Sequence, residues 1–130
     1  MQQFLQAKIL SIGHNFSRLR LRNAAIQNAG YQVVTTRETA LVLDLARKQD
    51  FDAVVICSSI PAHLREHIAR ELKRLRPTQP LIVLCEDGER DCFLDLAEEV
   101  VDAPHSGSQQ PVIAAIRRVT GNYGGVKFPA

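Results

Sequence analysis

Hydrophobic and polar positions follow two periods along this chain, and the period changes at regular intervals. Short apolar runs occupy residues 8–12, 31–35, 53–57, 81–85 and 100–101. Between them lie stretches in which apolar residues recur every three or four positions, at 16–29, 36–49, 61–75, 89–97 and 110–119. The runs predict strands and the stretches predict amphipathic helices.

Glycine and proline residues mark the ends of several predicted elements. Gly13 follows the first strand, and Gly30 ends the first helix where a left-handed cap is most easily tolerated. Pro61 opens the third helix, because its missing N–H has no partner in a first turn anyway. Pro77 ends that helix.

The alternation of strands and helices predicts the fold class. Five strands alternating with five helices indicate a parallel sheet, because each parallel crossover needs a helix-length return. The runs AVVIC (53–57) and LIVLC (81–85) are apolar throughout, which is typical of strands covered on both faces. The sequence therefore predicts an α/β, doubly wound domain over residues 1–121, followed by a flexible C-terminal tail at 122–130.

Composition narrows the function classes. The 130 residues are 45% apolar and 23% charged, which is ordinary for one globular domain. The 16 basic and 14 acidic residues nearly cancel, and this balance argues against direct nucleic-acid binding or a membrane surface. The three cysteines lack CxxC spacing and no segment resembles a signal peptide, so we expect a cytoplasmic protein with free thiols.

Basic residues cluster on two of the predicted helices. The run RLRLR at 18–22 includes Arg22, and the third helix carries Arg65 and the cluster KRLR at 73–76. Such clusters can contact an acidic partner or nucleic acid. Because no aromatic stacking residues accompany them, we interpret both as solvated helix faces, with Arg22 and Arg65 pointing outward.

In open parallel sheets, functional groups gather beyond the carboxyl ends of the strands. The residues at those ends are Gly13, His14 and Asn15; Cys57, Ser58 and Ser59; Cys85 and Glu86; and Ala103. These positions define the candidate site.

The order and spacing of the segments from Lys8 to Thr120 resemble the receiver domain of bacterial two-component response regulators. The matching pieces are KILSIGHN, the GYQV segment at 30–33, FDAVVICSSIP, RPTQPLIVLC and VVDAP. The resemblance implies a flavodoxin-like, CheY-like fold with strand order 2-1-3-4-5.

The resemblance fails at the site that defines receiver activity. Receivers carry an acidic pair after the first strand, a phosphate-accepting Asp after the third, Ser or Thr after the fourth, a lysine before the last proline and an aromatic residue on the fifth strand. The corresponding residues of this chain are Gly13 and His14, then Cys57, Cys85, Ala103 and Val100.

These differences remove the groups that bind Mg²⁺ and accept a phosphoryl group. Mg²⁺ requires oxygen ligands, and neither glycine nor imidazole supplies a carboxylate. Without Mg²⁺ or a lysine, nothing stabilises a transferring phosphoryl group. We therefore predict no phosphotransfer, no cofactor, no metal and no enzymatic activity, and interpret the chain as a degenerate receiver, or pseudo-receiver.

The two cysteines suggest an alternative. Cys57 and Cys85 end neighbouring predicted strands with His14 nearby, so the three residues could form a metal site or a redox-sensitive dithiol. Simple packing remains the default interpretation, because cysteine is among the most buried residue types. A third hypothesis, phosphorylation of Asp52 or Asp87, is the weakest because Asp52 lies at the wrong end of its strand.

The favoured hypothesis is a signalling module that binds a protein independently of phosphorylation. The resemblance implies a signalling kinase or an output protein as partner, and a homodimer stays open. Receivers commonly use the face formed by their fourth helix, fifth strand and fifth helix. In this chain, that face implies the interface candidates Phe93, Leu94, Leu96, Ile113 and Arg117.

Overall fold

The structure is a computed structural model, and it describes residues 5–86, 88–102, 108–121 and 126–127. Its main element is a parallel sheet of five strands in the order β3-β2-β4-β5-β6. The strands span Gln32–Thr36 (β3), Lys8–Ile12 (β2), Ala53–Ile56 (β4), Leu81–Cys85 (β5) and Glu99–Asp102 (β6). Numbered along the main sheet alone, this is the predicted order 2-1-3-4-5, so the predicted doubly wound fold is confirmed.

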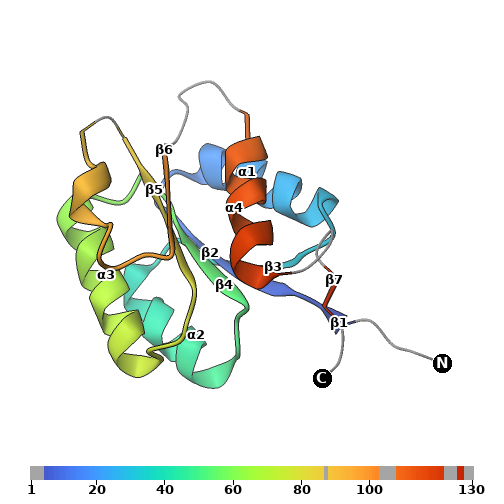
Figure 1. The fold of residues 1–130 in the computed structure, drawn as a ribbon, viewed down its shortest axis with the longest axis horizontal. Helices are drawn as coiled ribbons and strands as arrows, with labels where there is room; N and C mark the ends of the chain where they lie inside the picture. The colour runs from blue at the N-terminus through green and yellow to red at the C-terminus, as the bar shows by residue number, and fades with distance from the viewer. Residues whose placement is uncertain (1–4, 87, 103–107, 122–125, 128–130) are drawn as a thin grey trace.

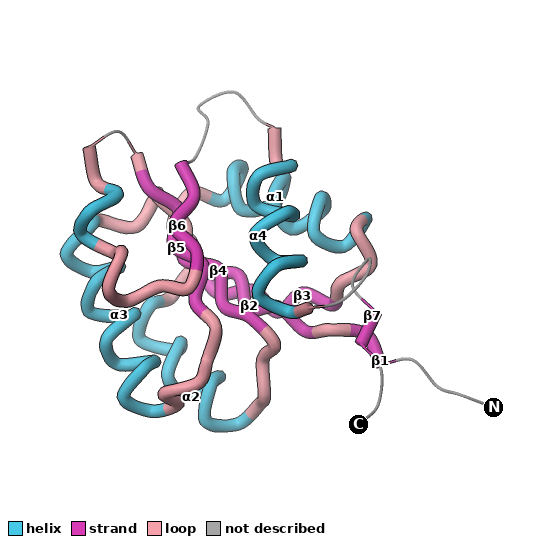
Figure 2. The backbone as a smooth tube through the Cα atoms, in the orientation of Figure 1, coloured by secondary structure: helices cyan, strands magenta, loops and turns pink. Residues whose placement is uncertain are grey.

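Helices cover both faces of the sheet (Figures 1 and 2). One face packs against α1 (Phe16–Asn28) and α4 (Gln110–Thr120), and the other against α2 (Val42–Lys48) and α3 (Ala62–Leu75). Each face has its own hydrophobic core, and β4 and β5 are buried along their whole length. This double coverage explains the unbroken apolar runs of the central strands.

Local sequence signals account for the helix ends. The Asn15 side chain caps α1 by accepting a hydrogen bond from the backbone N–H of Arg18 at 2.9 Å. Gly30 follows the helix with a φ of +100°, a conformation that favours glycine, as the sequence predicted. Gly121 ends α4 in the left-handed conformation, with a φ of +61°.

Two helix predictions were wrong in extent. The helix predicted over 36–49 is a 3₁₀ turn at Thr39–Leu41 followed by α2, because β3 continues to Thr36. The helix predicted over 89–97 is reduced to a 3₁₀ turn, η2 (Arg90–Cys92), and further turns. The described residues therefore form four α-helices instead of five.

Tertiary bonds at both ends of residues 89–98 explain the lost helix. The Glu89 carboxylate binds Arg65 and the backbone N–H of Glu86, and the Glu98 carboxylate binds Lys73 and the N–H of Leu81. A segment this short is a marginal helix on its own. Its bonds to the rest of the protein therefore determine its path.

A second, two-stranded sheet was not predicted. The strand β1 (Leu5–Gln6) pairs antiparallel with β7 (Val126–Lys127), which lies within the tail predicted to be flexible. The Gln6 side-chain amide also donates to the Gly30 carbonyl at 2.8 Å. Within the part of the chain that the structure describes, no helix is long and apolar enough to cross a membrane.

Candidate functional site

The loops at the carboxyl end of the sheet are joined by side-chain hydrogen bonds. The Ser59 hydroxyl after β4 accepts from the backbone N–H of His14 at 3.0 Å and of Asn15 at 3.3 Å, both after β2. The Arg37 guanidinium after β3 donates to the His14 carbonyl at 3.2 and 3.3 Å. These bonds hold the loops after β2, β3 and β4 together.

Cys57 occupies the centre of this edge and is buried, with 2% of its surface exposed. The Arg22 Nη1 lies 2.6 Å from its Sγ. Burial raises the pKa of the Cys57 thiol, and this effect outweighs the neighbouring Arg22 guanidinium, which lowers it. Cys57 is therefore a neutral thiol at neutral pH. The position after β4 thus presents neither a nucleophilic thiolate nor a carboxylate.

Gly13 packs directly on Cys57. A Cβ at Gly13 would lie 3.2 Å from the Cys57 Cβ, 3.3 Å from its Sγ and 3.4 Å from the Leu19 Cδ1. The two contacts with Cys57 are tighter than ordinary van der Waals separation, and the contact with Leu19 lies at its lower limit. A carboxylate side chain at this position would therefore displace its neighbours.

The prediction that Arg22 lies on a solvated face was wrong. Only 6% of Arg22 is exposed, and the other buried residues of α1 are Leu19 and Ile26. Arg22 lies three residues after one and four before the other, so it shares their face of the helix. Among the described residues, its Nε and the nearby Ser11 Oγ have no hydrogen-bond partner.

Arg65 was also predicted to point outward, and it is 1% exposed. Its Nε donates to the Ile60 carbonyl at 2.7 Å, its Nη1 to the Leu84 carbonyl at 2.8 Å, and its Nη2 to both carboxylate oxygens of Glu89. Its guanidinium also lies 5.1 Å from the centre of the Phe93 ring. Arg65 therefore joins the ends of β4 and β5 to the segment that replaces the predicted fourth helix.

The alternative based on Cys57 and Cys85 does not fit the structure. Val55 pairs with Ile82 and Ile56 with Val83, so odd residues of β4 share a face with even residues of β5. Cys57 packs in the core beneath α1 and α4, whereas Cys85 packs in the core beneath α2 and α3. Two thiols on opposite faces of a sheet cannot form a disulfide, and the proposed dithiol is excluded.

The metal version of that alternative fails as well. Among the described residues, which include His14, Cys57 and Cys85, no group of three or more His, Cys, Asp or Glu side chains could hold a metal ion. Burial raises the pKa of the Cys85 thiol to about 11, which disfavours the thiolate that binds metals.

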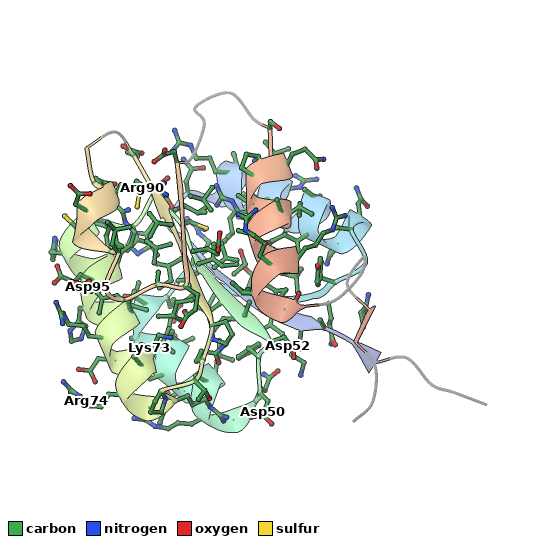
Figure 3. The ribbon with its side chains drawn as sticks, viewed as in Figure 1. Asp50, Asp52, Lys73, Arg74, Arg90 and Asp95 are labelled. Atoms are coloured by element: carbon green, nitrogen blue, oxygen red, sulfur yellow. The ribbon has the colours of Figure 1, made fainter. Side chains whose placement is uncertain are left out.

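The remaining predicted site residues lie in different places. Ala103 and Asp87 fall outside the described residues. Asp52 accepts a hydrogen bond from the backbone N–H of Lys8 at 2.8 Å, at the amino end of the sheet. Figure 3 shows Asp52 at the opposite end of the molecule from Arg90, which follows β5.

The five interface candidates are divided between core and surface. Phe93 is fully buried and Ile113 is 3% exposed, so neither side chain can contact a partner in this conformation. Their apolar side chains fill the two cores on either side of the sheet. Leu94 is 52% exposed, Arg117 is exposed and Leu96 is half-buried, and these three remain interface predictions.

No protein-family model matches the sequence, and no curated protein matches it. Solved structures do match its shape. A response regulator receiver domain from Clostridium thermocellum has a TM-score of 0.76 at 23% identity, over 88% of this chain and 94% of that chain. The response regulator TrrA from Thermotoga maritima, in complex with Mg²⁺-BeF, has a TM-score of 0.76 at 16% identity, over 87% and 98%. This chain has the receiver-domain fold.

The receiver fold also occurs in proteins of other descriptions. An adenylate cyclase from Rhodopirellula baltica has a TM-score of 0.78 at 14% identity, over 90% of this chain and 89% of that chain. Activity cannot be transferred between proteins on fold alone. The function of this receiver fold must therefore be argued from the residues at its carboxyl edge.

Proposed function

We propose that this chain is a pseudo-receiver, a signalling module of the two-component type that acts by binding a protein and is not phosphorylated. The observation that supports the proposal is the identity and environment of the residue at the phosphate-accepting position. Cys57 is a buried neutral thiol between the Arg22 guanidinium and Gly13, where receivers carry a phosphate-accepting aspartate.

The Mg²⁺ that receivers use does not fit these residues. Gly13 offers no ligand, a Cβ there would already crowd Cys57, and the buried Arg22 brings positive charge toward the pocket. Mg²⁺ needs hard oxygen ligands in near-octahedral geometry, and a cationic neighbour opposes its binding. We therefore expect no Mg²⁺-dependent phosphoryl transfer at this pocket.

An enzymatic role has no support in this pocket. The thiol of Cys57 lacks a base to activate it, because the polar side chains nearest to it are a guanidinium and the Ser11 hydroxyl.

A kinase or output protein is the partner that the receiver fold favours. Leu94, Leu96 and Arg117 are the surface residues through which a partner or a second copy would bind.

The proposal is tested by incubating the protein with acetyl phosphate and Mg²⁺ and measuring its intact mass. We expect no gain of a phosphoryl group, whereas a receiver that retains the acidic pair and the acceptor aspartate gains one under the same conditions. A stoichiometric phosphoryl adduct on any aspartate of this chain would overturn the proposal.

The proposed protein binding is tested by a separate measurement. Sedimentation velocity over a range of concentrations reports whether the protein forms a homodimer, and Leu94→Arg with Arg117→Glu tests the predicted face. If a dimer forms, we expect the double variant to be monomeric at the same concentration. If the double variant remains a dimer, the dimer interface lies on another surface.

A further inference from the structure

A groove runs between helix α1 and the edge strand β3, away from the acceptor position. It has a volume of about 360 Å³ and is lined by Phe16, Leu19, Arg20, Asn23, Ala24, Gln27, Thr35 and Arg37. Most of the lining surface is apolar, and the Phe16 side chain is 57% exposed at one end. The groove therefore offers apolar surface on which a partner side chain can pack.

The charges around the groove have a single sign. Arg20 and Arg37 line it, and no aspartate or glutamate does. The whole of α1 contains no acidic residue, and Arg20 forms no ion pair with any residue that the structure describes. Arg37 lies over the Phe16 ring, with its guanidinium carbon 5.6 Å from the ring centre. The groove therefore combines an apolar floor with a positive rim.

The strand beside the groove is the edge strand of the five-stranded sheet in the part of the chain that the structure describes. The Gln32 N–H donates to the Ala7 carbonyl, and the Thr36 carbonyl accepts from the Gly13 N–H, so even-numbered residues of β3 face β2. In a parallel ladder, the intervening residues Val33 and Thr35 then direct their N–H and C=O groups outward. β3 is the last strand on this side of the sheet. Such an edge is a template for another strand.

We propose that this groove binds an extended, acidic segment of a partner protein, which adds to β3 as a further strand. Its apolar side chains, on one face at every second residue, would pack along α1 from Phe16 to Ala24, and its carboxylates would pair with Arg20 and Arg37. The proposal rests on the proposed function and adds a second binding surface for a protein partner, separate from the one that contains Leu94, Leu96 and Arg117.

The groove favours a protein over a nucleic acid. An added strand satisfies the outward N–H and C=O groups of Val33 and Thr35, whereas a phosphate backbone could satisfy only the N–H groups. The chain also has a net charge of only +2, which gives little electrostatic affinity for a polyanion.

The experiment selects binders from a displayed library of random linear peptides and measures their affinity by fluorescence anisotropy. We expect the selected peptides to be acidic, with apolar residues at alternate positions. Arg20→Glu, which reverses a rim charge, and Ala24→Gln, which fills the groove, should each weaken binding at least about tenfold. The matched control is Arg74→Glu, an exposed helical arginine on α3, beneath the opposite face of the sheet (Figure 3).

Hydrogen exchange distinguishes strand addition from other contacts. Bound peptide should protect the amides of Val33 and Thr35, and Arg74→Glu should keep both the affinity and this protection. Selected peptides without acidic residues, equal binding by Ala24→Gln, or unprotected Val33 and Thr35 amides would each overturn the inference. Tighter binding of single-stranded DNA than of any peptide, lost in Arg20→Glu, would overturn it in favour of a nucleic-acid site.

The two proposals fail separately. Gain of a phosphoryl group from acetyl phosphate would overturn the pseudo-receiver proposal whatever the groove binds. The groove proposal is wrong if binding of the selected peptides depends on Leu94 and Arg117 and is unaffected by Arg20→Glu. The proposal that the chain is a protein-binding module would then still stand.

Discussion

The two buried arginines should differ strongly in how much stability the protein loses when each is replaced by methionine. Arg65→Met keeps a side chain of similar length against Phe93 and removes the guanidinium. The Ile60 and Leu84 carbonyls, which accept from Arg65 at 2.7 and 2.8 Å, then lose a buried donor. Each unsatisfied carbonyl costs about 1–3 kcal/mol. Glu89 is partly exposed and can be rehydrated, so we expect a total loss of about 4 kcal/mol.

Arg22→Met is the matched comparison, because Arg22 is also buried but poorly satisfied. Its contact with the Cys57 thiol is a weak interaction, and its Nε has no partner among the described residues. Replacing a buried charge by a hydrophobic residue of similar volume is often neutral or stabilising. We expect a change within about 1 kcal/mol of zero for this variant, by the same reasoning.

Urea unfolding followed by far-UV circular dichroism measures both values, since the chain has no tryptophan for fluorescence. Arg74→Met, at an exposed position on the same helix as Arg65, should change stability by no more than about 0.5 kcal/mol. The reasoning is refuted if Arg65→Met costs less than about 1 kcal/mol or if Arg22→Met costs as much as Arg65→Met.

Three further predictions concern the cysteines and Gly13. Burial raises the pKa of the Cys85 thiol from 9.0 to about 11, so the unfolded chain loses this proton first and stability should fall as pH rises through that window, by up to about 1.4 kcal/mol per pH unit. Cys85→Ala should flatten the alkaline profile of the unfolding free energy, and an unchanged slope would contradict the assignment. In a thiol titration with Ellman's reagent, the exposed Cys92 should react rapidly in the native protein while the buried Cys57 and Cys85 react only on unfolding; rapid native reaction of Cys57 would show an open pocket. Gly13→Ala should destabilise the protein by about 1–3 kcal/mol through overpacking against Cys57. A double-mutant cycle with Cys57→Ala should show a smaller penalty, and equal penalties in both backgrounds would place the strain elsewhere.

The sheet could be predicted from sequence because its signals are local and repeated. The runs around Val55 and Val83 are apolar without interruption, and only a strand covered on both faces needs such a run. The returns between strands carry helical periodicity, which forces parallel crossovers. The parallel α/β class follows from these two patterns, whereas the strand order was implied by the resemblance to receiver domains.

The positions of the arginines could not be predicted from residue type alone. Charged residues are rarely buried, so Arg22 and Arg65 were assigned to solvent. Spacing contained the contrary signal: Arg65 precedes Ile68 by three residues and Leu72 by seven, which places it on the buried face of α3. What the sequence does not contain is the set of backbone carbonyls, such as that of Leu84, that makes burial of Arg65 favourable.

The arrangement of the cysteines depended on strand register, which sequence does not specify. Cys57 and Cys85 both end buried strands, and sequence reasoning placed them side by side. A shift of one residue in register moves a side chain to the other face of the sheet. The pairing of Ile56 with Val83 has this effect, so the two thiols belong to separate cores.

The bonds at the carboxyl edge also bear on regulation. Ser59 joins the loops after β2 and β4, and Arg65 joins the ends of β4 and β5 to Glu89. A ligand can shift a conformational equilibrium only by its differential affinity for the two states. With Cys57 buried and its thiol neutral, this position offers no charged ligand for a cation. For the pseudo-receiver proposed above, we therefore expect no metal-driven switch at Cys57 and control by the availability of the partner.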